Sequence, residues 1–581
     1  MYDYREIWKQ KVAAALGAVL SREGEGAASG EIGEVAVENP PRPDMGDLGF
    51  PMFAFAKKFR KAPAQIAALV AEALGGGAAQ ALGPYVNIQL DRAETAREVL
   101  GALLASDSEP GRPGSLAGQR IMLEFSSPNT NKPLHLGHLR NDAIGESLAR
   151  ILRACGAEVR TVCIINDRGI HICKSMLAYQ ERFAGKTPAG EGRKGDHFVG
   201  DCYVCFNTMS KDDKAAEERA RALLRAWEAG DAETIALWKT MNGWTVAGMK
   251  ETWRRTGVSF DKFYFESETY QRGKEQVLRG LAQGLFYQSD DGAVWVDLSG
   301  QGLDQKALLR SDGTSLYITQ DIGTAIYRYE EWPFDRLIFV VGSEQQYHFK
   351  ALFAVLGKLG CPWAKNLYHL SYGMVNVPEG RMKSREGTVV DADDLLDELS
   401  SLALAEIRER DREETLKDAS GAAEKIALGA LHYYLLQNDP SKDMLFKKEE
   451  SLAFNGNTGP YLQYMGARIA SLLKKAGDKA AAAPAPEALA LLSTDAEWEV
   501  IKLLGGYNAR VAAAGAALDP SIAAAYAYDL AKAFSVFYHD CPILQAPSPP
   551  LVEARLALCR AVLAVLRDAM HLVCVPFLEE M

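Results

Sequence analysis

The sequence has no apolar run long enough to cross a membrane, although 48% of its 581 residues are hydrophobic. It also lacks a disulfide framework, because its nine cysteines are odd in number and scattered. These absences favour a cytoplasmic protein in a reducing compartment, without a membrane partner. The length exceeds what one compact core holds, so we expect about three domains.

Metal-binding patterns are scarce as well. Cys202 and Cys205 form the single CxxC pair, and His197 lies near them in the sequence. A tetrahedral zinc site normally needs four ligands, and no second pair is evident. We therefore predict no metal site and no tightly bound cofactor.

An excess of positive charge is absent too, since the formal net charge is −11. This weighs weakly against a protein that binds nucleic acid over its whole surface, but local basic patches can still bind phosphates. Two basic clusters are present, Lys57, Lys58, Arg60 and Lys61 in the first and Arg381, Lys383 and Arg385 in the second. For either cluster alone, a solvated surface is the simpler interpretation.

Residues 1–112 have the pattern of a small α+β domain. Amphipathic helical spacing runs from Tyr4 to Leu20 and from Pro63 to Leu74, and Tyr85 to Leu90 alternates like a strand. The segment from Asp107 to Gly118 is rich in proline and glycine, so we predict a linker there.

A different architecture, expected to span residues 118–400, begins with a strand–helix–strand pattern. Ile121 to Ser126 is a short apolar run, Leu139 to Ala154 has helical spacing, and Glu158 to Asn166 is β-branched. This is a βαβ unit, which implies an α/β domain with a Rossmann-like parallel sheet. The pattern returns as strand, helix and strand at Arg336–Gly342, Phe349–Leu359 and Tyr368–Val375.

Two helical regions complete the predicted organisation. About residues 185–305 separate the halves of the sheet as an insertion, whose middle from Lys211 to Arg255 is charged and helical. Residues 420–581 are predicted to form an all-α bundle, interrupted by an Ala/Pro-rich loop from Ala476 to Ala485.

The segment from Ser126 to His138, SSPNTNKPLHLGH, follows the first predicted strand and opens the first helix. Nucleotides bind at this junction of a doubly wound fold, because the helix N-terminus offers free N–H groups and a positive dipole to phosphate. His135 and His138 can donate hydrogen bonds to phosphate oxygens, and Gly137 leaves room for an adenine ring. Alone, the HxGH pattern is equally compatible with ordinary capping or surface histidines.

A second motif, RMKSREG from Arg381 to Gly387, follows the last predicted strand. A basic loop at this place can close over a triphosphate and stabilise charge at the α-phosphorus. Met382 and Lys383 are its candidates for contact with ATP. Without the first motif, an exposed turn is the simpler interpretation.

Together the two motifs resemble the HIGH and KMSKS signatures of class I aminoacyl-tRNA synthetases. The rest of the sequence is similar to arginyl-tRNA synthetases nearly from end to end. The segments that carry this resemblance are Met45–Asp47, Gly83–Asn87, Glu124–Asn129, Lys132–Arg140, Tyr317–Asp321, Val341–His348, Phe454–Tyr464 and Ala467–Ile469. The resemblance implies activation of L-arginine by ATP with Mg²⁺ and transfer to the 3′ end of tRNA(Arg). It also implies that the first step requires bound tRNA, and we expect a monomer.

The second motif departs from the superfamily pattern, since Ser384 stands where a lysine is usual and Lys383 stands at the first serine position. Arginyl enzymes often lack that lysine, and a lysine just upstream of HIGH is thought to replace it, which matches Lys132. The expected catalytic residues are therefore His135, His138, Lys132 and Lys383. The expected ATP contacts are His135, Gly137, His138, Met382 and Lys383.

Arginine carries a planar guanidinium with five donors, which demands a carboxylate in bidentate reach and further acceptors. The residues alone favour Asp321 as a helix N-cap, because a helical pattern follows from Ile322 to Glu330. The resemblance instead places Asp321, Tyr317 and Gln345 at the guanidinium. It assigns the substrate's amino and carboxylate groups to Glu124, Ser127 and Asn129. For Gln345 and Ser127, ordinary hydrogen bonding within loops is the alternative.

Two surfaces are expected to contact tRNA. In the C-terminal bundle, aromatic and basic side chains can stack on or pair with unstacked anticodon bases. The candidates are Tyr461, Gln463, Tyr464 and Arg468, of which Tyr461 also fits a packed helix interface. Lys57 and Lys58 are expected at the tRNA elbow.

Three other functions fit part of the sequence. Another class I synthetase would hold a different side chain at Asp321. A catalytically inactive homologue would only bind RNA, but the intact Lys132, His135, Gly137 and His138 argue against it. A small-molecule adenylyltransferase would leave the C-terminal bundle without a role.

Overall fold

The N-terminal domain is a small antiparallel sheet flanked by helices. The computed structural model describes residues 2–22, 32–105, 109–378, 390–409 and 418–581. The elements of this domain are α1 (Tyr4–Arg22), β1 (Leu48–Pro51), α2 (Ala56–Phe59), α3 (Pro63–Ala73), β2 (Ala79–Leu82), β3 (Tyr85–Ile88) and α4 (Arg92–Leu104). The strands pair antiparallel in the order β1-β3-β2. The predicted first helix is confirmed, and it buries Val12, Leu16 and Val19 on one face.

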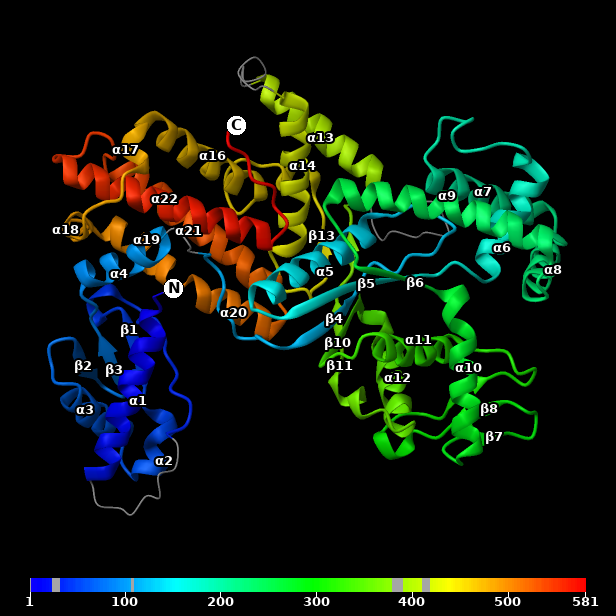
Figure 1. Cartoon of the computed structure of the whole chain (residues 1–581), viewed down its shortest axis with the longest axis horizontal. Helices are drawn as coiled ribbons and strands as arrows, with labels where there is room; N and C mark the ends of the chain where they lie inside the picture. The colour runs from blue at the N-terminus through cyan, green and yellow to red at the C-terminus, as the bar shows by residue number, and fades with distance from the viewer. Residues whose placement is uncertain (1, 23–31, 106–108, 379–389, 410–417) are drawn as a thin grey trace.

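A parallel sheet forms the centre of the molecule (Figure 1). Its strands and two of its covering helices are β4 (Arg120–Glu124), α5 (Leu136–Ala154), β5 (Glu158–Ile165), β6 (Lys262–Phe265), β10 (Arg336–Gly342), α12 (Gln346–Lys358) and β11 (Leu367–Tyr372). The strands pair in parallel in the order β11-β10-β4-β5-β6. The predicted Rossmann-like sheet is therefore confirmed.

Strand β6 was not predicted from the sequence pattern. It lies inside the range 185–305 that we interpreted as an insertion, and it pairs with β5 from Val162↔Lys262 to Ile165↔Phe265. A strand this short between two long helices gives too little periodicity to recognise. Part of that range therefore belongs to the central sheet.

The central sheet is buried on both faces. Ile121 and Leu123 of β4 point into a core shared with α5 and the C-terminal bundle. Met122, between them, points into a second core with α10 (Glu266–Ala282), α11 (Tyr317–Glu331) and α12. This alternation follows from the two-residue period of a strand. A strand covered on both sides reads as a continuous apolar run, as the sequence showed.

A group of helices leaves the sheet between β5 and β6 and packs around a core of its own. These helices are α6 (Ile170–Ala178), α7 (Gly195–Asp212), α8 (Ala216–Glu228) and α9 (Ala232–Thr256). Phe198 and Cys202 of α7 pack with Met176 of α6 and Met241 of α9. After α10, short strands pair antiparallel, namely β7 (Tyr287–Gln288), β8 (Val294–Val296) and β9 (Lys306–Leu309).

The C-terminal part of the molecule is helical, which confirms the predicted all-α bundle. From the end of the sheet onward the elements are β12 (Val375–Asn376), α13 (Ala392–Glu409), α14 (Ala419–Leu436), β13 (Met444–Leu445), α15 (Lys448–Ser451), α16 (Gly459–Ala476), α17 (Asp478–Ala481), α18 (Pro486–Leu489), α19 (Asp495–Gly505), α20 (Tyr507–Ala517), α21 (Pro520–Asp540) and α22 (Pro549–Leu572). The predicted loop Ala476–Ala485 is partly wrong, because α17 lies within it. None of the helices that the structure describes is both long and apolar enough to cross a membrane.

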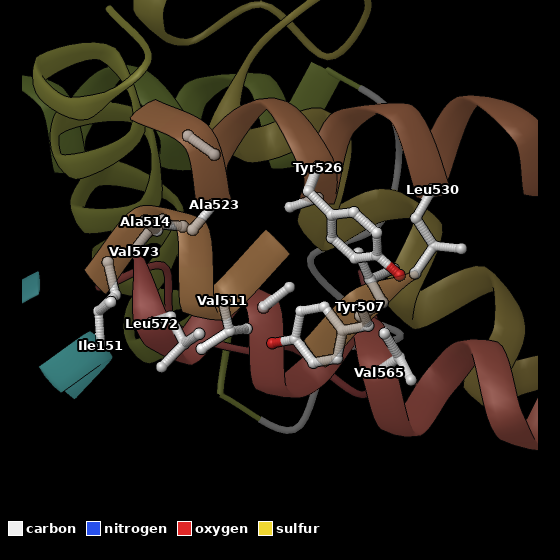
Figure 2. Packing of buried hydrophobic residues seen from close by; sticks show 14 of the residues in the cluster. Ile151, Tyr507, Val511, Ala514, Ala523, Tyr526, Leu530, Val565, Leu572 and Val573 are labelled. Carbon is white, nitrogen blue, oxygen red and sulfur yellow. The ribbon is translucent and has the colours of Figure 1, made fainter. Parts of the chain in front are cut away.

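Helix α5 contacts both the central sheet and the helices of the bundle, and Figure 2 shows its residue Ile151 beside the bundle. Ile151, near its C-terminal end, lies in one hydrophobic core with Ala514 of α20 and Leu572 of α22. A Cβ added at Gly515 would lie 2.7 Å from Sγ of Cys155, so glycine permits this close approach of α20 to the end of α5. The far end of α5 is therefore fixed by packing, and its near end carries the residues described next.

Candidate active site

Two histidines form the turn at which α5 begins. His135 is the N-cap residue, and its Nδ1 accepts a hydrogen bond from the backbone N–H of Gly137 at 3.1 Å. Nδ1 of His138 accepts from the backbone N–H of His135, also at 3.1 Å. The ring centroids lie 3.9 Å apart. Because each Nδ1 accepts, each neutral ring carries its proton on Nε2, where it can donate to a ligand.

The surroundings keep both imidazoles neutral. Burial lowers the pKa of His135 to about 3, and the positive charge of Lys132 acts in the same direction. Burial also holds the pKa of His138 well below its usual value, with a contribution from His135 and Lys132. The site therefore offers two N–H donors beside a lysine, a set suited to phosphate oxygens.

This turn is tightly packed on both sides. A Cβ added at Gly137 would lie 3.0 Å from Cε1 of His135, so a side chain there would push the ring away. On the outer side, the backbone N–H of Leu136 donates to the carbonyl of Val390 at 3.0 Å. The predicted basic motif, with Met382 and Lys383, precedes Val390 and lies outside the described residues.

The loop after β4 carries residues in unusual backbone conformations. Ser126 and Ser127 have φ values of 71° and 49°, in the left-handed region that ordinary side chains rarely adopt. Oγ of Ser127 donates to Oε1 of Glu124 at 3.2 Å, and the other carboxylate oxygen of Glu124 pairs with the buried guanidinium of Arg328 on α11. The amide of Asn166, just after β5, donates to the carbonyl of Ser127 at 3.1 Å. These contacts fix the loop on which the predicted substrate contacts stand.

Asp321 lies within α11 and does not cap it. The helix begins at Tyr317, and the N-cap position is Leu316, so the N-cap interpretation of Asp321 is wrong. The sequence pattern placed the start of the helix too late, because Tyr317 to Gln320 belong to its first turn. Oδ2 of Asp321 accepts a hydrogen bond from Nε2 of His348 on α12 at 2.6 Å. Tyr317, one turn earlier, is 75% exposed.

A cavity of about 1030 Å³ opens beside these residues. Asn129 and Tyr317 line it, which brings together two predicted arginine contacts from distant parts of the sequence. Glu266, at the start of α10, lines it as well. Burial raises the pKa of Glu266 to about 7, while Arg168 lowers it and the carboxylates Asp167 and Asp321 raise it further. Asp321 and Glu124 are not among the residues that line this cavity.

The candidate residues share one edge of the central sheet. Glu124 ends β4, Asn166 follows β5, Glu266 follows β6, and Gln345 ends a short 3-10 turn after β10. Ligands of open α/β sheets bind at the carboxyl ends of the strands. Sequence reasoning missed Asn166 and Glu266. Asn166 could have been predicted, because it is a polar residue at the end of a predicted strand. Glu266 could be predicted only with knowledge of the short strand β6, which it follows.

The predicted tRNA contacts lie on two distant surfaces. Lys57 and Lys58 are exposed on α2, and the nearby ring of Phe53, which the sequence analysis missed, is 55% exposed and meets Tyr85 edge-on. Proteins that bind single-stranded nucleic acid combine basic side chains with aromatic rings on which bases stack, and this surface offers both. In the bundle, Tyr464 is exposed and Arg468 lies over the ring of Tyr538, 4.0 Å from its centroid. Tyr461 is half-buried and packs near Tyr528.

Gln463 does not fit its predicted role as a tRNA contact. Its side chain is fully buried, and Nε2 donates to the carbonyls of Lys425 and Pro576 at 2.8 and 2.9 Å. It therefore ties α16 to α14 and the C-terminal tail. Its neighbours Leu462 and Met465 on α16 are buried as well.

Cys202 of the CxxC pair and the nearby His197 have different surroundings. Cys202 is buried in the core of the α6–α9 group, where burial raises the pKa of its thiol to about 12. His197 is 3.2 Å from Asp393, and Lys194 bridges Asp393 and Asp196 at 2.6 and 3.1 Å. The lysine supplies one positive charge to these carboxylates.

The parallel sheet, the histidine turn at the start of α5 and the helical bundle together define the class I aminoacyl-tRNA synthetase fold. Methionyl-tRNA synthetase from Mycobacterium tuberculosis, solved with methionyl-adenylate, shares this fold with a TM-score of 0.52 at 14% identity, over 79% of this chain and 91% of that one. Residues 100–447 match the family model of the tRNA synthetases class I (R) catalytic domain.

Further comparisons narrow the class to one family. Residues 6–90 match the arginyl tRNA synthetase N terminal domain, and residues 462–581 match the DALR anticodon binding domain. The arginine–tRNA ligase of Treponema pallidum subsp. pallidum is 56% identical over the whole of both chains. The Thermus thermophilus arginyl-tRNA synthetase structure has a TM-score of 0.84 at 26% identity, over 99% of this chain and 100% of that one. The chain belongs to the arginyl-tRNA synthetase family.

Proposed function

We propose that the chain is an arginine–tRNA ligase whose active centre has a nucleotide end at the start of α5 and an amino-acid end between β4, α11 and α12. The arginine carboxylate attacks the α-phosphorus of ATP, and pyrophosphate leaves. A ribose hydroxyl of the tRNA 3′ end then attacks the carbonyl carbon of the adenylate, and AMP leaves. Neither step needs a nucleophile from the protein, so the work is positioning and charge stabilisation.

At the nucleotide end, His135 and His138 donate from Nε2 to phosphate oxygens, and Lys132 stabilises the negative charge that develops at the α-phosphorus. The observation that carries this assignment is that both Nδ1 atoms are occupied by backbone N–H groups. This leaves Nε2 as the donor of each ring without any rearrangement on binding. Mg²⁺ enters with ATP as part of the substrate. We keep Gly137, Met382 and Lys383 as further contacts with ATP.

At the amino-acid end, the carboxylate of Asp321 receives the guanidinium, with Tyr317 and Gln345 beside it. Glu124, Ser127 and Asn129 hold the amino and carboxylate groups of the substrate. Because Arg328 neutralises Glu124 in part, Glu124 is a weaker partner for a second guanidinium than Asp321 is. This difference favours binding of the side chain at Asp321 and of the amino group near Glu124.

We propose that tRNA(Arg) contacts both ends of the molecule. The basic and aromatic surface of Phe53, Lys57 and Lys58 meets the elbow, and Tyr461, Tyr464 and Arg468 meet the anticodon. The division into residues 1–112, 118–400 and 420–581 gives each surface its own domain, and the matches to an N-terminal domain and an anticodon binding domain support it. We further propose that the protein acts as a monomer in the cytoplasm.

The decisive experiment is arginine-dependent ATP–pyrophosphate exchange, with and without tRNA. We expect exchange with arginine and tRNA together, and much less without tRNA. Asp321→Asn removes the charge that is proposed to face the guanidinium, and kcat/KM for arginine should fall by a factor that corresponds to about 2–5 kcal/mol. The matched control is Asp304→Asn, an exposed carboxylate that accepts from Tyr347 and should change little.

Each alternative predicts its own result in the same assay. Exchange with a different amino acid would identify another class I synthetase. Binding of tRNA without any exchange would identify an inactive RNA-binding homologue. An unchanged KM for arginine in Asp321→Asn would remove Asp321 from the pocket.

A further inference from the structure

His348 holds the carboxylate that is proposed to receive the guanidinium. Its Nε2 lies 2.6 Å from Oδ2 of Asp321, across the gap between α12 and α11. The two side chains are 22% and 37% exposed, so the hydrogen bond is partly shielded from water. A carboxylate can only accept, so the imidazole is the donor. None of the arginine contacts predicted from the sequence includes this residue.

The imidazole is held in place by its surroundings. His348 lies in the first turn of α12. The ring of the next residue, Phe349, meets the ring of His348 edge-on, with centroids 5.6 Å apart. Phe349 in turn stacks on His369 at 4.4 Å, and Nε2 of His369 donates to the carbonyl of Val341 at 3.0 Å. A row of rings thus connects His348 to strands β10 and β11. A donor mounted on such a rigid support restricts the orientation of its acceptor.

An oriented carboxylate suits a guanidinium better than it suits an ammonium. The two parallel N–H groups of a guanidinium require both carboxylate oxygens in one plane. The hydrogen bond from His348 occupies one lone pair of Oδ2 and leaves Oδ1 and the second lone pair of Oδ2 open. It also fixes the rotation of the carboxylate, so the two acceptors are already oriented for the two N–H groups of the guanidinium. An ammonium is a point charge and gains nothing from this arrangement.

We propose that His348 is a positioning residue that orients Asp321 for the guanidinium and thereby sharpens the choice of arginine over lysine. The proposal rests on the function proposed above for Asp321. Without the hydrogen bond, the Asp321 carboxylate turns freely and can follow a single ammonium. Binding of arginine then weakens, while binding of ATP, which takes place at the other end of the site, does not change.

Two substitutions separate the hydrogen bond from the packing of the ring. His348→Phe keeps a ring of similar shape and loses the N–H donor. His348→Gln loses the ring and keeps an N–H donor at a similar reach. Tyr347→Phe, which removes a hydroxyl that bonds to the exposed Asp304, is the control on the same turn. The measurements are kcat and the KM values for arginine and for ATP in the pyrophosphate exchange with tRNA, and the same with lysine.

We expect His348→Phe to raise KM for arginine about tenfold, the size of one lost hydrogen bond to a charged group. KM for ATP and kcat should stay within about threefold, and the preference for arginine over lysine should fall in parallel. His348→Gln should recover most of the affinity, and Tyr347→Phe should match the unsubstituted protein.

Three outcomes would overturn the proposal. One is an unchanged KM for arginine in His348→Phe. Another is a larger loss in His348→Gln than in His348→Phe, because packing of the ring would then be what matters. The third is an equal rise of both KM values. If Asp321→Asn still loses arginine activation in any of these cases, the proposed function stands and only the role of His348 fails. If Asp321→Asn keeps its affinity for arginine, both fail.

Discussion

The nucleotide end and the amino-acid end of the active site are built in different ways. At the nucleotide end, Lys132, His135 and His138 lie in one continuous segment, and backbone N–H groups of that same segment orient both rings. At the amino-acid end, Asp321 and His348 come from separate helices and orient each other across the gap. The first end is fixed by local geometry, whereas the second exists only when α11 and α12 pack together.

Because the two ends are built differently, we expect substitutions at each end to change different kinetic constants. In the proposed function, a substitution at the nucleotide end removes a donor that acts on the reacting phosphate, so we expect it to change the rate. A substitution at the amino-acid end disturbs the carboxylate that is proposed to bind a part of the substrate remote from the reaction, so we expect it to change affinity and selectivity. The experiments below separate these two effects.

The largest effect on kcat is expected from His138→Asn. Asparagine lacks the Nε2–H that is proposed to donate to the phosphate, although its amide oxygen can still accept from the backbone. Removal of one donor to a developing charge lowers kcat by about 10²–10³-fold. We expect KM for arginine to stay unchanged in steady-state exchange assays. The control is His539→Asn on the exposed end of α21. A weaker affinity for arginine in His138→Asn would show that the two ends are not separate.

Substrate analogues test the amino-acid end with the unsubstituted protein. Canavanine keeps the guanidinium fork, whereas lysine offers one ammonium and leaves an acceptor of the site unpaired. An unpaired buried acceptor costs about 1–3 kcal/mol, so lysine should be activated about one to two decades less efficiently than canavanine. Pyrophosphate exchange with each amino acid measures this ratio. Equal rejection of the two analogues would contradict a pocket built around Asp321.

A further prediction concerns stability instead of activity, at a buried carboxyl beneath the nucleotide end. Asp142 lies one turn after His138 on α5, and burial raises its pKa to about 7, although the nearby Ser126 and Trp253 lower it. The folded protein therefore holds this proton more tightly than the unfolded chain does. Stability falls as the pH rises from about 4 to about 7, and the loss is complete above pH 7. Ionised Asp142 then costs the folded state about 4 kcal/mol.

Asp142→Asn removes this cost. We expect its thermal unfolding midpoint to exceed that of the unsubstituted protein by a few degrees at pH 8, and the difference to disappear near pH 4. Asp304→Asn, at an exposed position, should show no such pH dependence. A gain of equal size at both pH values would mean that ionisation of Asp142 is not the cause. In that case the carboxyl of Asp142 would carry no charge beneath the nucleotide end at either pH.

The sequence predicted the architecture well wherever an element was long or strongly patterned. The βαβ unit around α5 and the strand Arg336–Gly342 were found, because their apolar periodicity is dictated by burial on both faces. The strand β6 was missed, and with it Glu266. The start of α11 was placed too late, which made Asp321 look like a cap. Gln463 was taken for a surface residue because a resemblance between motifs does not report which side of a helix is buried.

The sequence by itself determined the class of fold, the family and the nucleotide end, because a strand, a turn and a helix N-terminus are local features whose hydrogen bonds lie within one short segment. Only the tertiary structure decided how Asp321 is oriented, which residues line the cavity and which face of α16 meets solvent. Those properties depend on contacts between residues far apart along the chain, and no local pattern encodes the angle at which two helices meet.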